Sequence, residues 1–112
     1  MIYQMKLHPE PFERIKNESQ TIEVRLFDEK RALLKVGDEI EFSLISDDSQ
    51  KIKVKVLELL RHNTFSELFN SFSLQQFGGE NVNDLVNGMY RYYTKENEIK
   101  YGVLGIRLEY IK

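Results

Sequence analysis

Three polar side chains that could act together on a ligand alternate along residues 21–26. Thr21, Glu23 and Arg25 are interleaved with aliphatic residues, and strict alternation is typical of a half-buried β-strand whose two faces differ. A carboxylate on such a face can accept hydrogen bonds from the exocyclic amine or ring N–H of a nucleobase. A guanidinium beside it can form paired hydrogen bonds with a carboxylate or a phosphate. The sequence therefore predicts a compact polar site on this strand. The aliphatic residues that face the core are Ile22, Val24 and Leu26.

The same polar residues also have a structural interpretation. One face of an antiparallel sheet is commonly solvated, and a Glu23–Arg25 ion pair on that face would merely close the rim of a sheet. The residue pattern alone leaves both interpretations open.

Other chemistry has little support in the sequence. The two histidines, His8 and His62, lie far apart and lack metal-ligand spacing, and there is no cysteine. A structural zinc site is therefore not expected, and we predict no metal and no cofactor. The Gly78-Gly79 pair lacks the spacing and the following lysine of a phosphate-binding loop. We interpret His8, which precedes Pro9, as the start of a helix rather than as a catalytic base.

Length and composition indicate one globular domain spanning residues 1–112. Hydrophobic residues make up 41% of the chain, and seven Phe and six Tyr can supply a core. The net charge of −2 argues against strong non-specific binding of long nucleic acids, but permits recognition of one nucleotide or one base in a short strand. No apolar run approaches the roughly 20 residues of a membrane span, and the N-terminus lacks a signal-peptide pattern. We expect a cytoplasmic protein with no membrane partner; the sequence leaves the oligomeric state open.

The periodicity of the apolar residues predicts an α+β fold, a small, mostly antiparallel β-barrel decorated by short helices. Strands are expected at residues 3–7, 21–26, 38–45, 51–60 and 104–110. Helices are expected at 9–17, 65–72 and 82–93, with a last short helical turn after Thr94 that ends near Gly102. Thr64 and Glu67 fit a capping box. Loops are expected at 27–36 and 75–80.

The two central strands are predicted to form a hairpin around residues 47–49. A tight turn there places Glu41 opposite Lys55. The residues expected to be buried are Ile40, Phe42, Val54 and Val56. Lys51, Lys53 and Lys55 would be exposed opposite acidic residues, so we do not interpret them as a basic RNA-binding face.

The order of these motifs resembles the ASCH domain family, whose fold is related to the RNA-binding PUA barrel. The resemblance rests on four features in sequence: the short helix with prolines in its first turn within residues 7–16, Thr21-Ile22-Glu23-Val24-Arg25, Val36-Gly37-Asp38 followed by Ile40 and Phe42, and a final Tyr101-Gly102-Val103-Leu104-Gly105-Ile106. It covers nearly the whole chain and implies a PUA-like barrel.

Some bacterial ASCH proteins look like small amidohydrolases that remove the acetyl group from N4-acetylated cytidine. The resemblance implies that a Lys directly before the Thr-Ile pair, a nearby Thr and a downstream Glu take part in catalysis. Here Gln20 occupies the Lys position and Glu23 the second Thr position, and Glu80 is the downstream Glu. Gln has neither charge nor basicity. Glu23 and Glu80 remain candidate catalytic residues because carboxylates can activate water, and Lys16 or Lys30 would have to replace the missing amine.

The sequence thus favours binding of a nucleotide, a modified nucleoside or a short RNA in a cleft beside the helix at 9–17. The expected ligand-binding residues are Lys16, Gln20, Thr21, Glu23 and Arg25. Two alternatives remain: a metal-free amidohydrolase acting on an N4-acylated cytidine, and a protein-interaction module without a small ligand.

Overall fold

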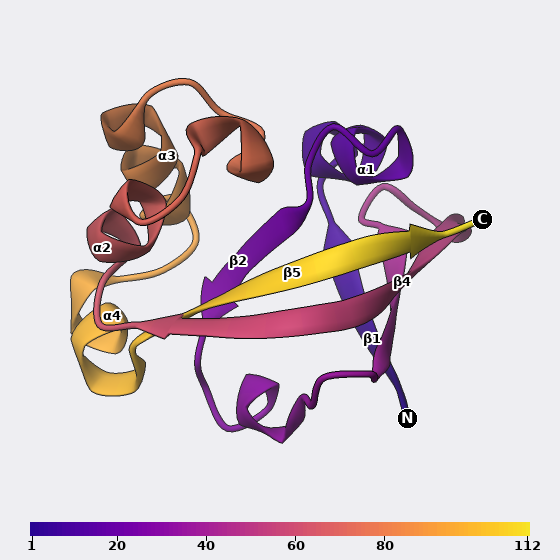
Figure 1. Cartoon of the computed structure of the whole chain (residues 1–112), viewed down its shortest axis with the longest axis horizontal. Helices are drawn as coiled ribbons and strands as arrows, with labels where there is room; N and C mark the ends of the chain where they lie inside the picture. Colours follow the sequence, from indigo (N-terminus) through magenta and orange to yellow (C-terminus); the bar gives the residue numbers. More distant parts are fainter.

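The computed structural model describes the whole chain, residues 1–112, as a curled sheet with short helices around it (Figure 1). The strands are β1 (Ile2–Leu7), β2 (Ile22–Leu26), β3 (Glu39–Leu44), β4 (Asp47–His62) and β5 (Val103–Ile111). The helices are α1 (Pro9–Lys16), α2 (Phe65–Asn70), α3 (Val82–Met89) and α4 (Lys95–Tyr101), with 3₁₀ turns η1 (Arg31–Leu33) and η2 (Leu74–Phe77). No helix is long and apolar enough to cross a membrane.

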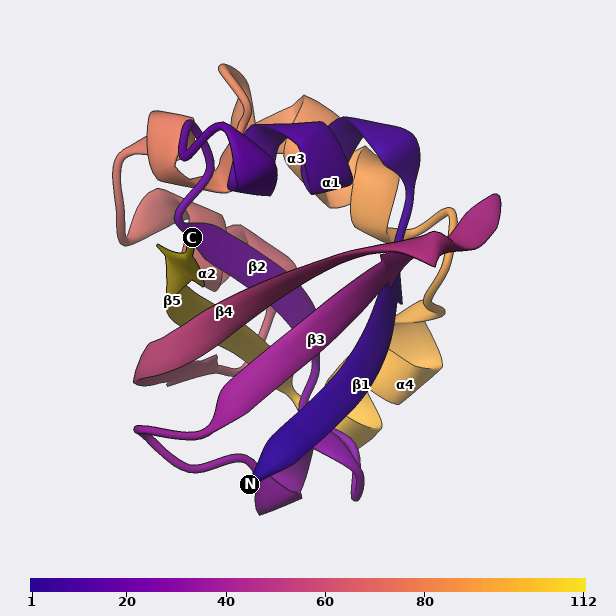
Figure 2. The same ribbon diagram turned by 90° about the vertical axis from the view of Figure 1, so that its right-hand side faces the viewer.

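The five strands form one mixed sheet in the order β1-β3-β4-β5-β2. β1 pairs with β3 in parallel, and the other neighbouring pairs are antiparallel. The sheet curls into a half-barrel, so that β1 and β2 are its two free edges (Figure 2). The predicted α+β class and the mostly antiparallel, PUA-like barrel are confirmed.

Two hydrophobic cores lie on opposite faces of the sheet. The first fills the half-barrel under α1 and includes Phe12, Ile15, Leu104 and Ile106. The second lies between the outer face of β2 and the helices α2 and α3. It includes the three aliphatic residues of β2 with Phe65, Leu68, Phe69, Phe77 and Val103. The helices therefore hold β2 against the barrel from outside.

β2 is covered on both faces, which corrects the expected half-buried strand. Glu23 lies opposite Ile106 and Arg25 opposite Leu104 in the β2–β5 ladder. Directly opposed residues share one face of a sheet, so Glu23 and Arg25 point toward the barrel interior while their aliphatic neighbours point toward the helices. Glu23 is only 8% exposed.

The β3–β4 hairpin has a different register from the expected one. Its turn lies at residues 45–46, and β4 already begins at Asp47, so the segment expected to be the turn belongs to the strand. Glu41 consequently lies opposite Lys53, with an irregularity in the ladder between Ser43 and Leu44. The prediction that placed Glu41 opposite Lys55 was wrong, because the turn at 45–46 and the irregularity between Ser43 and Leu44 together set the register of the ladder.

The buried side of the hairpin is confirmed. Ile40, Phe42, Val54 and Val56 are all fully buried. Lys51 and Lys55 are exposed and Lys53 is half-buried. Nζ of Lys51 lies 3.7 Å from Glu41 and Nζ of Lys53 lies 3.9 Å from Glu39, so carboxylates accompany two of the three lysines.

Most helix boundaries follow from local capping. α1 begins after His8, with Pro9 in its first turn. Oγ1 of Thr64 accepts from the Glu67 N–H at 3.1 Å at the start of α2, and Thr94 caps α4 in the same way. Gly102, with φ 74°, ends α4. α2 and α3 are shorter than predicted, and η2 overlaps the start of the segment expected to be a loop.

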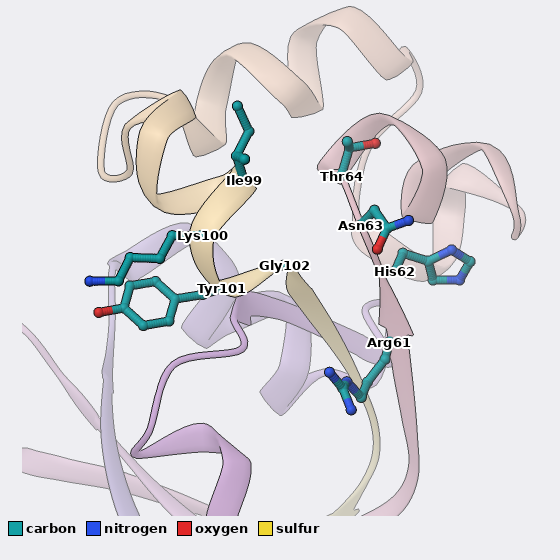
Figure 3. Close-up of a pocket in the computed structure, with 8 residues that line it drawn as sticks. All are labelled: Arg61, His62, Asn63, Thr64, Ile99, Lys100, Tyr101 and Gly102. Carbon is teal, nitrogen blue, oxygen red and sulfur yellow. The ribbon is translucent and has the colours of Figure 1, made fainter.

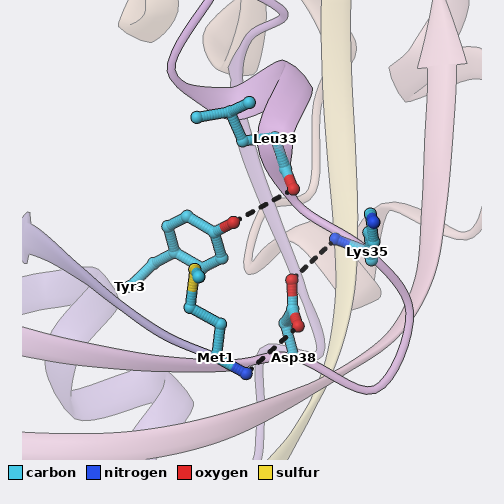
Figure 4. Close-up of polar contacts among 5 residues, drawn as sticks. All are labelled: Met1, Tyr3, Leu33, Lys35 and Asp38. Atoms are coloured by element: carbon cyan, nitrogen blue, oxygen red, sulfur yellow. Dashed lines mark hydrogen bonds and ion pairs between the residues drawn. The ribbon is translucent and has the colours of Figure 1, made fainter.

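The connection from β2 to β3 is tied to the start of β1 (Figure 4). Asp38 Oδ2 accepts from the Lys35 N–H at 2.9 Å, and Oδ1 lies 3.4 Å from the Met1 ammonium group. The Tyr3 hydroxyl donates to the Leu33 carbonyl at 3.1 Å. These contacts fix the edge strand β1 beside the segment predicted to be a charged loop.

Candidate functional site

A cleft of about 610 Å³ opens between α1, the segment formed by α3 and the residues after it, and the edge strand β2. Figure 1 shows α1 and α3 apart at the upper right and upper left of the molecule, with β2 running below them. Glu23 and Arg25 line this cleft, as do Lys6 and Leu7 at the end of β1. It lies beside α1, where the sequence predicts a ligand site.

Glu23 and Arg25 form a half-enclosed ion pair in the cleft. Arg25 Nε donates to Glu23 Oε2 at 2.9 Å, and Arg25 Nη2 also lies 2.9 Å from that oxygen. Nη2 donates in addition to the Lys6 carbonyl at 2.7 Å. The Glu23 side chain is 11% exposed and the Arg25 side chain 13%. Arg25 therefore holds one carboxylate oxygen and fixes the direction of the other.

The second carboxylate oxygen of Glu23 is a free hydrogen-bond acceptor. Oε1 makes no hydrogen bond with the protein, yet it is not among the atoms sealed from solvent. Because Glu23 lines the cleft, this oxygen reaches solvent there. A carboxylate oxygen held in one orientation by an ion pair can accept a hydrogen bond from a ligand with little loss of side-chain entropy.

Gln20 and Arg14 form a second fixed pair beside Glu23. Gln20 is 5% exposed. Its Oε1 accepts from Arg14 Nε at 3.0 Å, and its Nε2 donates to the Ile22 carbonyl at 3.0 Å. The terminal nitrogens of Arg14 make no hydrogen bond with the protein. Gln20 thus orients Arg14 and leaves the end of its guanidinium for a ligand.

Gly78 makes room for the Arg14–Gln20 pair. It follows η2 with φ 78°, a left-handed conformation that favours glycine. A Cβ at this position would lie 2.3 Å from Arg14 Nε and 3.0 Å from Gln20 Oε1. The expectation that this glycine belongs to an unremarkable loop missed this packing role.

The structure brings three of the predicted site residues together and leaves three outside the cleft. Gln20, Glu23 and Arg25 line it. Lys16 is exposed at the end of α1, and Glu80 is exposed after η2; neither lines the cleft. Thr21 is half-buried, and its backbone bonds to Gln76 and Leu108 hold it at the far end of β2.

Aromatic and basic residues that follow α3 form the opposite wall, which sequence reasoning did not identify. Arg91, Tyr92 and Tyr93 line the cleft. The Tyr92 ring stacks on His8 with centroids 4.9 Å apart and an interplanar angle of 30°, although Tyr92 is 60% exposed. The run from Tyr90 to Tyr93, with Arg91 inside it, was a signal in the sequence, since aromatic rings beside cations are typical of nucleic-acid sites.

The charge of the cleft is nearly balanced. Its lining carries four cationic and three acidic side chains: Lys6, Arg14, Arg25 and Arg91 against Glu10, Glu23 and Asp84. Only Glu23 and Arg25 of these form an ion pair. Three cations therefore face two carboxylates, which suits a ligand with one or two phosphates better than a long polyanion.

A buried carboxylate outside the cleft positions this wall. Glu98, 4% exposed, accepts from the Phe65 N–H at 2.7 Å and from the Tyr90 hydroxyl at 2.5 Å. The hydrogen bond to Glu98, burial and the charge of Glu98 raise the pKa of Tyr90 to about 12. Glu98 therefore ties α4 to the start of α2 and to the residue that precedes Arg91. No three His, Asp or Glu side chains gather into a metal-binding group.

Comparison with known proteins places this chain among structural relatives of the same size. The family model described as the ASCH domain matches residues 5–112. The crystal structure of hypothetical protein PH0355 has 34% sequence identity and a TM-score of 0.90, covering 99% of this chain and 100% of that one. The solution structure of PF0455 from Pyrococcus furiosus has 32% identity and a TM-score of 0.78, covering 100% and 99%.

A more distant structure shares the fold alone. The S128A mutant of ZmASCH from Zymomonas mobilis has 11% identity and a TM-score of 0.64, covering 96% of this chain and 67% of that one. No curated protein matches the chain.

Proposed function

Because the chain belongs to the ASCH domain family, we propose that its cleft binds a nucleotide, a modified nucleoside or one nucleotide of a short single-stranded RNA. The observation that carries this proposal is the free oxygen of Glu23. Oε1 lies in a concave site, oriented by Arg25 and open to a ligand. A fixed acceptor of this kind suits the exocyclic amine or ring N–H of a nucleobase.

The walls of the cleft support the same ligand class. Tyr92 and His8 offer aromatic faces at its mouth, and a base that stacks on an aromatic ring gains about 1–3 kcal/mol. The terminal nitrogens of Arg14 are free for a phosphate oxygen. The acceptor and the aromatic wall suit the edge and the face of a base, and the guanidinium suits a phosphate.

The amidohydrolase alternative has less support. Gln20, which occupies the position of the implied amine, is engaged on both ends of its amide and carries no charge. Glu80 is outside the cleft, so Glu23 would have to activate water alone while paired with Arg25. The third alternative, an interaction module without a ligand, predicts a Glu23 carboxylate with both oxygens occupied by the protein.

A thermal-shift screen against nucleosides, nucleotides and short RNAs tests the proposal. A ligand present at 100 times its dissociation constant adds about 2.7 kcal/mol to the free energy of unfolding, which raises the melting temperature of a domain of this size by several degrees. The Arg14→Gln variant should lose most of the shift caused by phosphorylated ligands and keep the shift caused by nucleosides. Absence of any shift across the screen would contradict the proposal.

A further inference from the structure

A second depression, of about 640 Å³, lies where β4 ends and β5 begins. It is lined by residues 61–64 and 99–102 (Figure 3). Figure 3 shows Lys100 and Tyr101 on one side of Gly102 and Arg61 on the other. None of these residues lines the cleft of Glu23.

The two cations of this depression, Arg61 and Lys100, contact aromatic rings and form no ion pair with a carboxylate. The Arg61 guanidinium carbon lies 3.8 Å from the centroid of the Phe27 ring, and Lys100 Nζ lies 5.1 Å from that of Tyr101. No carboxylate is within 4 Å of either cation, and none lines the depression. Both cations are therefore held in place, with their hydrogen-bond donors left for an anion.

The nearest buried carboxylate does not neutralise this surface. Glu98 precedes Ile99 and Lys100 on α4, but its two oxygens accept from Phe65 N and the Tyr90 hydroxyl in the interior. The chain as a whole carries a net charge of −2. Two unpaired cations over aromatic rings form a local basic surface on an otherwise acidic molecule.

The depression and the cleft are close to each other along the chain in two places. The segment after α3 lines the cleft at Tyr93, and the following helix α4 lines the depression from Ile99 onward. Arg25 on β2 lines the cleft, and Phe27, which follows the end of β2, lies beneath Arg61. An oligonucleotide with several phosphates offers anionic groups to both places.

We propose that Arg61 and Lys100 bind the phosphodiester backbone of a single-stranded RNA that has another of its nucleotides in the cleft. This inference rests on the proposed function and narrows the ligand to an oligonucleotide. Cations that lie beside aromatic rings are typical of surfaces that bind single strands without reading their sequence. The cleft would then select a base, and the depression would add affinity that depends on strand length.

The test compares the hexanucleotide C₆ RNA with cytidine 5′-monophosphate on the wild type and on the double variant Arg61→Gln/Lys100→Gln. Loss of two phosphate contacts should lower the slope of log affinity against log salt by about 1.4 and weaken C₆ binding by about 10- to 25-fold at 0.1 M salt. Binding of the monophosphate should not change. The matched control Lys51→Gln/Lys55→Gln removes the same charge elsewhere and should retain the wild-type affinity for C₆.

The outcomes separate this inference from the proposed function. If the monophosphate binds but C₆ binds no more tightly, or if the double variant binds C₆ like the wild type, the second site is refuted and the cleft is not. An equal loss of affinity in the lysine control would also refute the second site, since it would reflect net charge alone. If neither ligand binds the wild type, both proposals fail. Circular-dichroism melting of each variant confirms that it is folded.

Discussion

Arg25 on β2 reaches across the open side of the half-barrel and donates to the main-chain carbonyl of Lys6 on β1 at 2.7 Å. The two strands are the edges of the sheet and are not paired with each other. The same guanidinium holds Glu23 Oε2. One side chain therefore both bridges the edges of the barrel and orients the carboxylate proposed to read the ligand.

Replacement of Arg25 by Ala should destabilise the fold by about 3 kcal/mol. The change leaves the nearly buried Glu23 carboxylate without a partner, and breaking a buried pair on one side typically costs about 3–5 kcal/mol. Urea unfolding followed by circular dichroism measures the loss. The double variant Glu23→Ala/Arg25→Ala should be more stable than Arg25→Ala, since no lone charge remains. A loss of stability below 0.5 kcal/mol in Arg25→Ala (roughly the scatter expected for surface substitutions) would show that the contacts of Arg25 with Glu23 and Lys6 do not stabilise the fold.

Gly78→Ala tests the packing of Arg14. The left-handed backbone should cost about 1–2 kcal/mol of stability, and the new Cβ must displace Arg14 from Gln20, because it would lie 2.3 Å from Nε. Nucleotide affinity should fall together with stability. Gly37→Ala is the matched control, because Gly37 also has positive φ (94°) but has no atom within 4 Å of the added carbon. It should lose similar stability and keep the wild-type affinity; equal affinities in the two variants would contradict the role given to Arg14.

The Tyr90–Glu98 hydrogen bond predicts a stability change at high pH. The pKa of Tyr90 is raised to about 12 in the folded protein, whereas an unfolded Tyr titrates near 10. The folded state thus holds its proton more tightly than the unfolded state. This contribution to stability is complete below pH 10 and disappears as the pH rises toward 12.

Denaturant unfolding of the wild type and Tyr90→Phe at pH 8, 10 and 11 measures this contribution. The stability advantage of the wild type should be largest at pH 8 and should shrink at the two higher values. Glu98→Gln should weaken the same pH dependence, because the hydrogen bond to the Glu98 carboxylate is its largest cause. A difference between wild type and Tyr90→Phe that stays constant with pH would refute the assignment.

We expect the wild type to be a poor deacetylase toward N4-acetylcytidine. A well-placed general base contributes about 10²–10⁴-fold to rate, and Gln20 cannot act as one. Gln20→Lys alone should restore little, because its ammonium would lie beside Arg14 Nε and near Glu23 in the same cleft. Gln20→Lys with Glu23→Thr should exceed either single variant. Chromatography of the reaction products measures turnover, and robust hydrolysis by the wild type would overturn this expectation.

The pairing of Glu23 with Arg25 was predictable from the sequence, whereas the residues of the cleft's opposite walls were not. Alternation along β2 places Glu23 and Arg25 on one face because strand geometry has period two. The wall residue Arg91 lies 77 positions along the chain from Arg14, and no local pattern says that α1 and the residues after α3 face each other. The ion pair was anticipated, but the burial of both faces of β2 was not. That burial depends on where α2 and α3 pack against the strand, which no local pattern gives.

The hairpin shows the same limit on a smaller scale. The alternation of Ile40 and Phe42 with charged residues fixes which side chains are buried, and this prediction is confirmed. Register depends on the position of the turn and here also on the irregularity between Ser43 and Leu44, and polar residues at 47–49 resemble a turn although they begin β4. A shift by two residues keeps every side chain on its face, so the core was predicted correctly while Glu41 received the wrong partner.

The most direct test of the central claim is the base preference of the wild type and Glu23→Gln, measured by isothermal titration with cytidine and uridine 5′-monophosphates. Cytidine has an N4 amine donor and an N3 acceptor, whereas uridine has an O4 acceptor and an N3–H donor. With Oε1 of Glu23 accepting from the exocyclic amine, cytidine should bind about 10- to 100-fold more tightly than uridine, as expected for a hydrogen bond to a charged group; a preference for uridine would place Oε1 at the ring N–H instead. In Glu23→Gln, Arg25 should retain the amide oxygen and turn the amide nitrogen toward the ligand, which should abolish or reverse the preference. The control Lys51→Gln should bind like the wild type. Equal preferences in wild type and Glu23→Gln, or no binding of either monophosphate by the wild type, would contradict the account.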